Sequence, residues 1–222
     1  MYDILVVVAH PDDEVLGCGG FIAKSIKKGL RVKLVCLADG VSARTNGDVS
    51  KKELEERRSA CKKACLILGL KNIEFYDFQD NQMDQYPLLK IVQTIEKIIK
   101  KDTPNIILTH FKDDLNIDHQ IVNKATTTAC RPEVGHPVKK LLFFEVHSST
   151  EWQVDAMFCP NWFEDISPYI KLKLEAMRAY KEELKQWPHP RSIEGIEALA
   201  KWRGATVGLD YAEAFKLGRI IK

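Results

Sequence analysis

Near its amino terminus the chain carries the stretch Ile4-Leu5-Val6-Val7-Val8-Ala9-His10-Pro11-Asp12-Asp13-Glu14, in which an apolar run leads directly into one imidazole and three carboxylates. An apolar run of this length without alternation is typical of a buried strand in a parallel sheet. In open α/β sheets, ligands bind beyond the carboxyl ends of such strands. The stretch therefore predicts a fold class and the position of a functional site.

Strands and helices alternate in the pattern that follows. It predicts, in order, a helix over 17–28, a strand over 31–37, a helix over 51–68, a strand over 73–76, a helix over 88–100, a strand over 106–108, a helix over 118–129 and a strand over 141–146. Such alternation implies a Rossmann-like three-layer α/β/α sandwich with a mainly parallel sheet. We expect one domain, 1–222, whose carboxyl-terminal portion is helical from about residue 165, with helices over 168–185 and 193–203.

Composition excludes several classes of protein. The 222 residues include 33 basic and 31 acidic side chains, and a net charge of +2 gives no reason to expect nucleic acid as a partner. No apolar stretch reaches membrane-spanning length, and the six cysteines form no CxxC pair, so we expect reduced thiols in a soluble cytoplasmic protein. Self-association is expected because soluble enzymes commonly form homo-oligomers.

A second polar loop follows the predicted strand 106–108 and ends in Asp118-His119. His10, Asp13 and His119 can supply two nitrogens and one oxygen to a single divalent ion, which leaves a coordination position open for water. Zinc suits this set, and ferrous iron is an alternative. Asp12 would remain an uncoordinated carboxylate able to take a proton from that water. Carboxylates after a strand often only cap a helix, as Asp118 could, but two such loops with histidines favour a metal site.

These motifs resemble those of the PIG-L family, also called LmbE-like N-acetylglucosaminyl de-N-acetylases. The family's A-H-P-D-D-E motif and its later D-H pair stand here as 9–14 and 118–119, and Arg57 and the tail 211–215 match further features. The resemblance implies that zinc is bound by His10, Asp13 and His119 and that Asp12 is the general base.

One position departs from the family pattern. Many members carry H-x-D-H in the later loop, whereas this chain has Asn116 in place of the first histidine. An asparagine can donate a hydrogen bond to an oxyanion but cannot exchange a proton near neutral pH. Either Asn116 acts only as a donor, or the acid is one of four histidines, namely His110, His136, His147 and His189.

Four further side chains are candidates for substrate binding: Arg57, Arg131, His189 and Arg191. Each has a plain structural alternative, such as a solvated helix-start arginine or a rigid corner at 187–190. His147 follows the predicted strand 141–146 and is a candidate acid or substrate ligand, and Trp152 could stack on a sugar or belong to the core. Gly17-Cys18-Gly19-Gly20 lacks the spacing of a dinucleotide-binding loop, so tight backbone packing is the expected role.

The resemblance implies a zinc-dependent hydrolase that removes the acetyl group from an N-acetylated hexosamine. The sugar would be nucleotide-linked, lipid-linked or attached to another small aglycone, and the reaction would belong to surface glycan or glycoconjugate synthesis. Two alternatives stay open: a metal-dependent deacylase of a non-sugar amide, and a catalytically silent glycan-binding protein. Magnesium-assisted phosphoryl chemistry is disfavoured because two histidine ligands suit zinc or iron better.

Overall fold

The computed structural model describes residues 1–42 and 51–222. Its strands form one seven-stranded sheet in the order β3-β2-β1-β4-β5-β7-β6. Their bounds are β1 Ile4–Val8, β2 Val32–Ala38, β3 Asn72–Phe78, β4 Ile106–His110, β5 Lys140–Phe144, β6 Trp162–Asp165 and β7 Ala212–Ile220. The first five strands are parallel and match the predicted ones, which confirms the predicted fold class.

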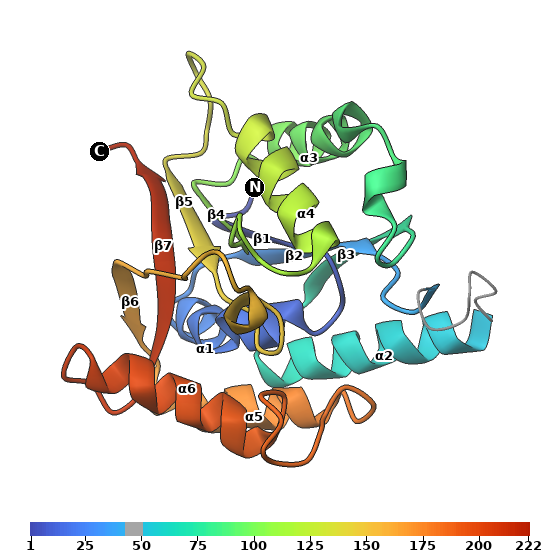
Figure 1. The fold of residues 1–222 in the computed structure, drawn as a ribbon. Coiled ribbons are helices and arrows are strands. Elements are labelled where there is room, and N and C mark those ends of the chain that lie inside the picture. Colours follow the sequence, from blue (N-terminus) through green and yellow to red (C-terminus); the bar gives the residue numbers. More distant parts are fainter. Residues whose placement is uncertain (43–50) are drawn as a thin grey trace.

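Helices cover both faces of this sheet (Figure 1). One face carries α1 (Asp13–Lys27), α2 (Lys51–Ile67), α5 (Ile170–Arg178) and α6 (Ile193–Ala205), and the other carries α3 (Leu88–Asp102) and α4 (Ile117–Ala129). Side chains alternate along β1. Ile4, Val6 and Val8 pack into the hydrophobic core on one face of the sheet, and Leu5 and Val7 pack into the core on the other face. Burial on both faces explains why the β1 sequence is continuously apolar.

The centre of the sheet sets the position of the site. Ile4 of β1 pairs with Val32 of β2 on one side and with Ile106 of β4 on the other. Chain order therefore reverses at β1, and the loops after β1 and β4 lie next to each other at one edge. This is the topological switch point at which open α/β sheets bind ligands.

The carboxyl-terminal portion differs from the sequence prediction. It contains helices α5 and α6, but it also contains β6 and β7, which pair antiparallel with each other while β7 pairs antiparallel with β5. The predicted helix 168–185 ends at Arg178, and turns follow. The described residues also include short 3-10 helices at Met83–Gln85, Thr150–Trp152 and Ser167–Tyr169.

Helix α1 begins earlier than its apolar pattern indicated, so Asp13 and Glu14 occupy its first turn. The glycines that follow serve close packing, as expected. A Cβ at Gly17 would lie 2.3 Å from the Phe144 ring, and one at Gly20 would lie 2.7 Å from Ile166. The packing of α1 against the sheet therefore fixes the residues that begin this helix.

Within the described residues, no helix is both long and apolar enough to cross a membrane. All six cysteines are free thiols, and all except Cys159 are buried. The thiols thus behave as small apolar side chains of the core.

Candidate metal centre and active site

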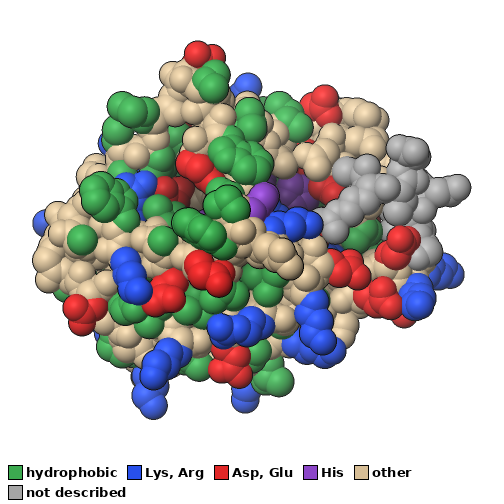
Figure 2. Space-filling model, turned by 60° about the horizontal axis from the view of Figure 1, so that its bottom comes forward, with side chains coloured by type: hydrophobic (Ala, Val, Ile, Leu, Met, Phe, Trp, Pro, Cys, Tyr) green, Lys and Arg blue, Asp and Glu red, His purple; other side chains and the backbone are tan. Residues whose placement is uncertain are grey.

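Polar side chains from several loops converge on a pocket beyond the carboxyl ends of the central strands. The pocket has a volume of about 160 Å³, and its lining includes His10, Asp12, Gly40, Arg57, Asp80, Asn81, Asn116, Glu183 and Arg191. Figure 2 shows histidine side chains at the bottom of a hollow that hydrophobic, basic and acidic side chains surround. The lining comes from segments far apart in the sequence, so the folded sheet is required to assemble it.

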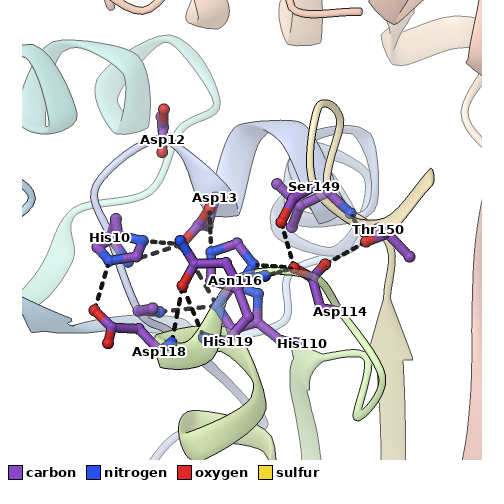
Figure 3. Close-up of polar contacts among 12 residues, drawn as sticks. His10, Asp12, Asp13, His110, Asp114, Asn116, Asp118, His119, Ser149 and Thr150 are labelled. Atoms are coloured by element: carbon purple, nitrogen blue, oxygen red, sulfur yellow. Dashed lines mark hydrogen bonds and ion pairs between the residues drawn. The ribbon is translucent and has the colours of Figure 1, made fainter. Parts of the chain in front are cut away.

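His10, which lines this pocket, meets Asp13 and His119 (Figure 3). One potential ligand atom from each lies within 4.8 Å of the others, and all three residues are buried. Asp13 Oδ1 is 3.4 Å from His119 Nε2, and Asp13 Oδ2 is 3.5 Å from His10 Nδ1. Asp13 Oδ2 accepts the His10 backbone N–H, whereas Oδ1 accepts no hydrogen bond. An unsatisfied buried carboxylate oxygen between two imidazoles fits a divalent cation.

The electrostatics of this cluster also fit a cation. Burial disfavours an imidazolium at His119, but Asp13 and Asp114 raise its pKa to about 9. Despite the same burial penalty, neighbouring carboxylates raise the pKa of His10 well above its usual value. Burial opposes the charge of Asp13, yet His119 and His110 hold its pKa well below the usual range. The carboxylates therefore favour positive charge here, which a bound metal ion would supply in place of protons.

Asp114 fixes the orientation of His119. Its Oδ1 lies 3.0 Å from His119 Nδ1 and accepts hydrogen bonds from the Asn116 backbone N–H and the Ser149 hydroxyl. Its Oδ2 accepts from the Thr150 hydroxyl at 2.5 Å. These contacts lower the pKa of Asp114 to about 2 in spite of its burial. A carboxylate on Nδ1 directs Nε2 toward Asp13, as in the carboxylate–histidine pairs of metal sites.

Two other carboxylates orient His10 in the same way. His10 Nε2 lies 2.9 Å from Asp80 Oδ1 and 3.0 Å from Asp118 Oδ2, so Nδ1 is the nitrogen that faces Asp13. Asp118 also accepts backbone N–H groups from Asn81 and Met83, which ties the loop after β3 to helix α4. Asp118 is thus a partner of His10, and the predicted capping role falls instead to Asn116.

Asp12 lines the same pocket as His10 and lies among charged side chains. It is 1% exposed, and its Oδ2 is 3.3 Å from Arg57 Nη2 and 3.2 Å from Arg191 Nη1. Both guanidinium groups also contact Glu183. Burial raises the pKa of Asp12 although the two arginines oppose this, which favours a carboxylate that can accept a proton.

The backbone of Asp12 is held in an unusual conformation. Its φ of 122° lies in the region that side-chain-bearing residues rarely adopt. Such conformations cost about 1–3 kcal/mol and occur at functional sites where surrounding contacts enforce them. Asp12 immediately precedes α1, and this conformation gives its carboxylate a place beside the pocket rather than in the helix.

Asn116 lines the pocket but serves two structural contacts. Its Oδ1 accepts from the backbone N–H groups of Asp118 and His119 and so caps α4, while its Nδ2 donates to Asn81 Oδ1 at 2.9 Å. The predicted oxyanion donor is therefore engaged with another side chain in this structure. Donation to a substrate would require exchange of that hydrogen bond.

The histidines considered as acids are placed differently from one another. His147 is buried in a separate cavity of about 20 Å³ shared with Lys173 and Glu213, and burial lowers its pKa to about 3. Neither of its ring nitrogens has a hydrogen-bond partner. His110 stacks on His119 at 3.9 Å, and its Nε2 accepts the Ala9 backbone N–H. Neither ring lines the catalytic pocket.

The remaining candidates divide into two groups. Arg57 and Arg191 reach the pocket, and His189 supports Arg191 by accepting its backbone N–H through Nδ1. Arg131 does not reach it. This half-exposed arginine follows the carboxyl end of α4, whereas the site lies at the amino end, and it pairs with Glu96 at 3.2 Å. The prediction of Arg131 as a substrate ligand is not supported, because a helix of 13 residues, about 20 Å long, separates the two positions.

His136, like Arg131, lies near the carboxyl end of α4 and away from the pocket, since its ring contacts the Ala129 carbonyl. Sequence reasoning missed two charged residues that line the pocket, Asp80 and Glu183, as well as Gly40 and Asn81. Asp80 follows β3 as the other polar residues follow their strands, and that position was a usable signal. Glu183 stands in a run of charged residues that looks like a solvated helix face.

Comparisons with known proteins agree with this arrangement. The family described as GlcNAc-PI de-N-acetylase (PIG-L) matches residues 5–130, which is more than half of the chain. The chain is 27% identical to diacetylchitobiose deacetylase of Thermococcus kodakarensis, over 96% of this chain and 82% of that protein. It is 31% identical to the uncharacterized deacetylase YaiS of Escherichia coli, over 80% of this chain and 90% of that protein.

Solved structures show the same fold. The N,N'-diacetylchitobiose deacetylase of Pyrococcus horikoshii superposes with a TM-score of 0.78 at 23% identity, over 97% of this chain and 83% of that one. The segments that follow β1 and β4, which carry His10, Asp13 and His119, both lie within the matched family region. The chain therefore belongs to the PIG-L family of de-N-acetylases, enzymes that hydrolyse an amide.

Proposed function

We propose that the protein removes the acetyl group from an N-acetylated hexosamine and that its activity depends on a divalent metal ion, zinc in the first instance. The observation that carries the proposal is the convergence of His10, Asp13 and His119, together with the buried carboxylate of Asp12 in the pocket that His10 also lines. The sugar is supported by relatives whose names specify diacetylchitobiose and N-acetylglucosaminyl malate as substrates. A nucleotide-linked, lipid-linked or other small aglycone and a role in surface glycan synthesis are part of the proposal.

A metal ion held by His10, Asp13 and His119 would polarise the amide carbonyl and acidify the attacking water. Asp12 accepts a proton from that water, since its carboxylate lines the same pocket. Addition of water to the amide and cleavage of the C–N bond give acetate and an amine. The proton taken by Asp12 is returned to the departing nitrogen by the same carboxyl group, because none of the four candidate histidines lines the pocket and Asn116 cannot exchange a proton.

Arg57 and Arg191 keep Asp12 in place and present further N–H donors to the pocket. Their charges are balanced by Asp12 and Glu183, so the pocket favours an uncharged polar group over a strongly charged one. A sugar ring with its hydroxyl groups meets this requirement. The free, mostly buried thiols support the proposal of a reducing, cytoplasmic location.

The test is a panel of substrates given to the purified chain. N-acetylglucosamine, diacetylchitobiose, N-acetylglucosaminyl malate and N-acetylated amino acids are incubated with enzyme, and free amine and acetate are both measured. We expect release from the sugars, loss of activity with a chelator, and recovery with zinc or ferrous iron. Faster release from the amino acids would favour the non-sugar deacylase, and sugar binding without release would favour a silent glycan-binding protein.

Two variants separate the roles of the side chains. Asp12→Asn is expected to keep the metal and to lose turnover, whereas His119→Ala is expected to lose the metal. Full metal occupancy in a folded His119→Ala protein would contradict the ligand assignment. The partly exposed Asp113, in the loop between β4 and α4, offers a control, since Asp113→Asn removes a carboxylate that contacts only Lys112 among the described ion pairs.

A further inference from the structure

The unusual backbone of Asp12 has an identifiable cause in the chain that follows it. The backbone N–H of Asp12 donates to Glu14 Oε2 at 3.0 Å, across a single intervening residue. This contact turns the backbone back on itself at the start of α1, and Asp12 has its φ of 122° there. Glu14 is completely buried, so water cannot replace it as the acceptor.

Glu14 is itself held from the opposite side of the core. The hydroxyl of Tyr180 donates to Glu14 Oε1 at 2.5 Å, and Tyr180 is 1% exposed. Tyr180 comes from the turns that follow α5, more than 160 residues away in sequence. Its ring also lies beneath the guanidinium of Arg57, with 5.4 Å between the Arg57 Cζ and the ring centroid. Tyr180 therefore contacts two residues that hold Asp12: Glu14, which accepts the Asp12 backbone N–H, and Arg57, which pairs with the Asp12 carboxylate.

Two thiols complete the surroundings of Glu14. The Sγ atoms of Cys61 and Cys65 lie within 4.8 Å of its carboxylate, near enough to suggest a second metal site. Both Glu14 oxygens, however, already accept a hydrogen bond, one from Asp12 and one from Tyr180. A metal ion would have to displace these donors, so the contacts favour a carboxylate committed to Asp12.

We propose that Glu14 and Tyr180 are positioning residues that hold the carboxylate of Asp12 in its catalytic orientation. The inference rests on the proposed role of Asp12 as the base. Glu14 fixes the Asp12 backbone through Oε2, and Tyr180 fixes Glu14 through Oε1. Neither side chain lines the pocket, so both act on the reaction through the residues they hold: Glu14 through Asp12, and Tyr180 through Glu14 and through Arg57, which pairs with Asp12. Misplacement of a catalytic group by about 1 Å can cost about 100-fold in rate, which sets the scale of the effect.

The first experiment compares kcat, KM and metal content in matched variants. Glu14→Leu is expected to lower kcat by about 30-fold or more while KM stays within twofold and one metal ion per chain is retained. Glu14→Gln should stay within about threefold of the parent, because the amide oxygen accepts from Asp12 and the amide nitrogen donates to Tyr180. Tyr180→Phe removes one hydrogen bond and is expected to lower kcat by about fivefold.

The matched control is Tyr211→Phe. Tyr211 also donates its hydroxyl to a carboxylate, Glu197 Oε1 at 2.9 Å, but this partly exposed pair lies outside the site. We expect unchanged kcat for Tyr211→Phe. Equal losses for Tyr211→Phe and Tyr180→Phe would overturn the proposal, because the effect would then be general destabilisation.

The second experiment is a double-mutant cycle with Asp12→Asn. If Glu14 acts only through Asp12, Glu14→Leu should change the residual rate of Asp12→Asn by less than about twofold. A full additional loss in that background would overturn the proposal, as would a second metal ion per chain that Cys61→Ser removes. A crystal structure of Glu14→Leu gives a readout besides activity, and Asp12 with its φ and carboxylate unmoved would also overturn the proposal.

These outcomes separate the inference from the proposed function. If Asp12→Asn keeps full activity, the base assignment fails first, and the positioning role fails with it. If Asp12→Asn is inactive while Glu14→Leu turns over at the parent rate, only the positioning role fails.

Discussion

Replacement of Asp114 by asparagine should weaken metal binding without unfolding the protein. Asp114 lies 3.0 Å from His119 Nδ1 and is completely buried, so solvent screens this contact little. Its pKa falls from 3.8 to about 2, and a difference of roughly two pKa units corresponds to about 2 kcal/mol in favour of the charged carboxylate. His119 contributes part of this preference and Ser149 and Thr150 the rest, so an uncharged amide should weaken zinc binding by up to about 30-fold, which is equivalent to about 2 kcal/mol.

The measurement is a titration of metal-free protein with zinc in the presence of a competing chromophoric chelator. Ser149 and Thr150 donate through hydroxyl groups that can rotate, so both can adapt to asparagine and the fold should persist. Asp113→Asn, one residue earlier and paired with Lys112, is the control and should bind zinc as the parent does. A zinc affinity of Asp114→Asn within twofold of the parent would refute the role assigned to this carboxylate.

Three further predictions concern stability and substrate handling. The pKa of Asp114 in the folded protein lies below its ordinary 3.8, so this carboxylate stabilises the metal-free protein fully above pH 5 and loses its effect on acidification. The loss should be about 1 kcal/mol by pH 3 and about 2 kcal/mol by pH 2. Urea denaturation of the parent and of Asp114→Asn at both ends of this pH range measures the loss. Gly17→Ala should lower the melting temperature by about 4 °C or more, since its Cβ meets Phe144, whereas Gly19→Ala, with contacts of 3.5 Å, should not. Arg191→Ala should lower kcat/KM by about tenfold or more and exposed Arg131→Ala should leave it unchanged, as initial rates on the preferred N-acetyl sugar would show.

The sequence predicts those residues of the candidate site that follow the carboxyl end of a strand. His10, Asp12 and Asp13 follow one apolar run, and His119 follows another, so the parallel sheet brings them together without further information. Arg131 illustrates the limit of this reasoning. It follows a helix that begins at the site, and the length of that helix, which the sequence predicted as 118–129, already separates Arg131 from the site by about 18 Å.

The side chains that sequence reasoning missed depend on contacts between distant segments. Glu183 is one of several charged residues in its segment, and only the folded chain shows that Arg57 and Arg191 converge on it. The strand β7 gave a stronger signal, because Ala212, Ala214 and Phe215 are apolar next to Glu213 and Lys216. We nevertheless predict from the sequence a helical carboxyl-terminal portion, with a helix over 193–203 and no strand after it. In the structure Glu213 is buried in β7, where it accepts the backbone N–H groups of Gly20 and Phe21.

The place of β7 between β5 and β6 has a consequence for how the protein is made. During synthesis, β5 and β6 emerge from the ribosome well before residues 212–220, and until then each presents an unpaired strand edge. The nascent chain thus passes through a stage in which the strands from β1 to β6 have been synthesised while the position of β7, between β5 and β6, is still empty. Chaperone dependence and aggregation during expression are expected to be concentrated in this interval, and a truncation that removes β7 would make the stage permanent.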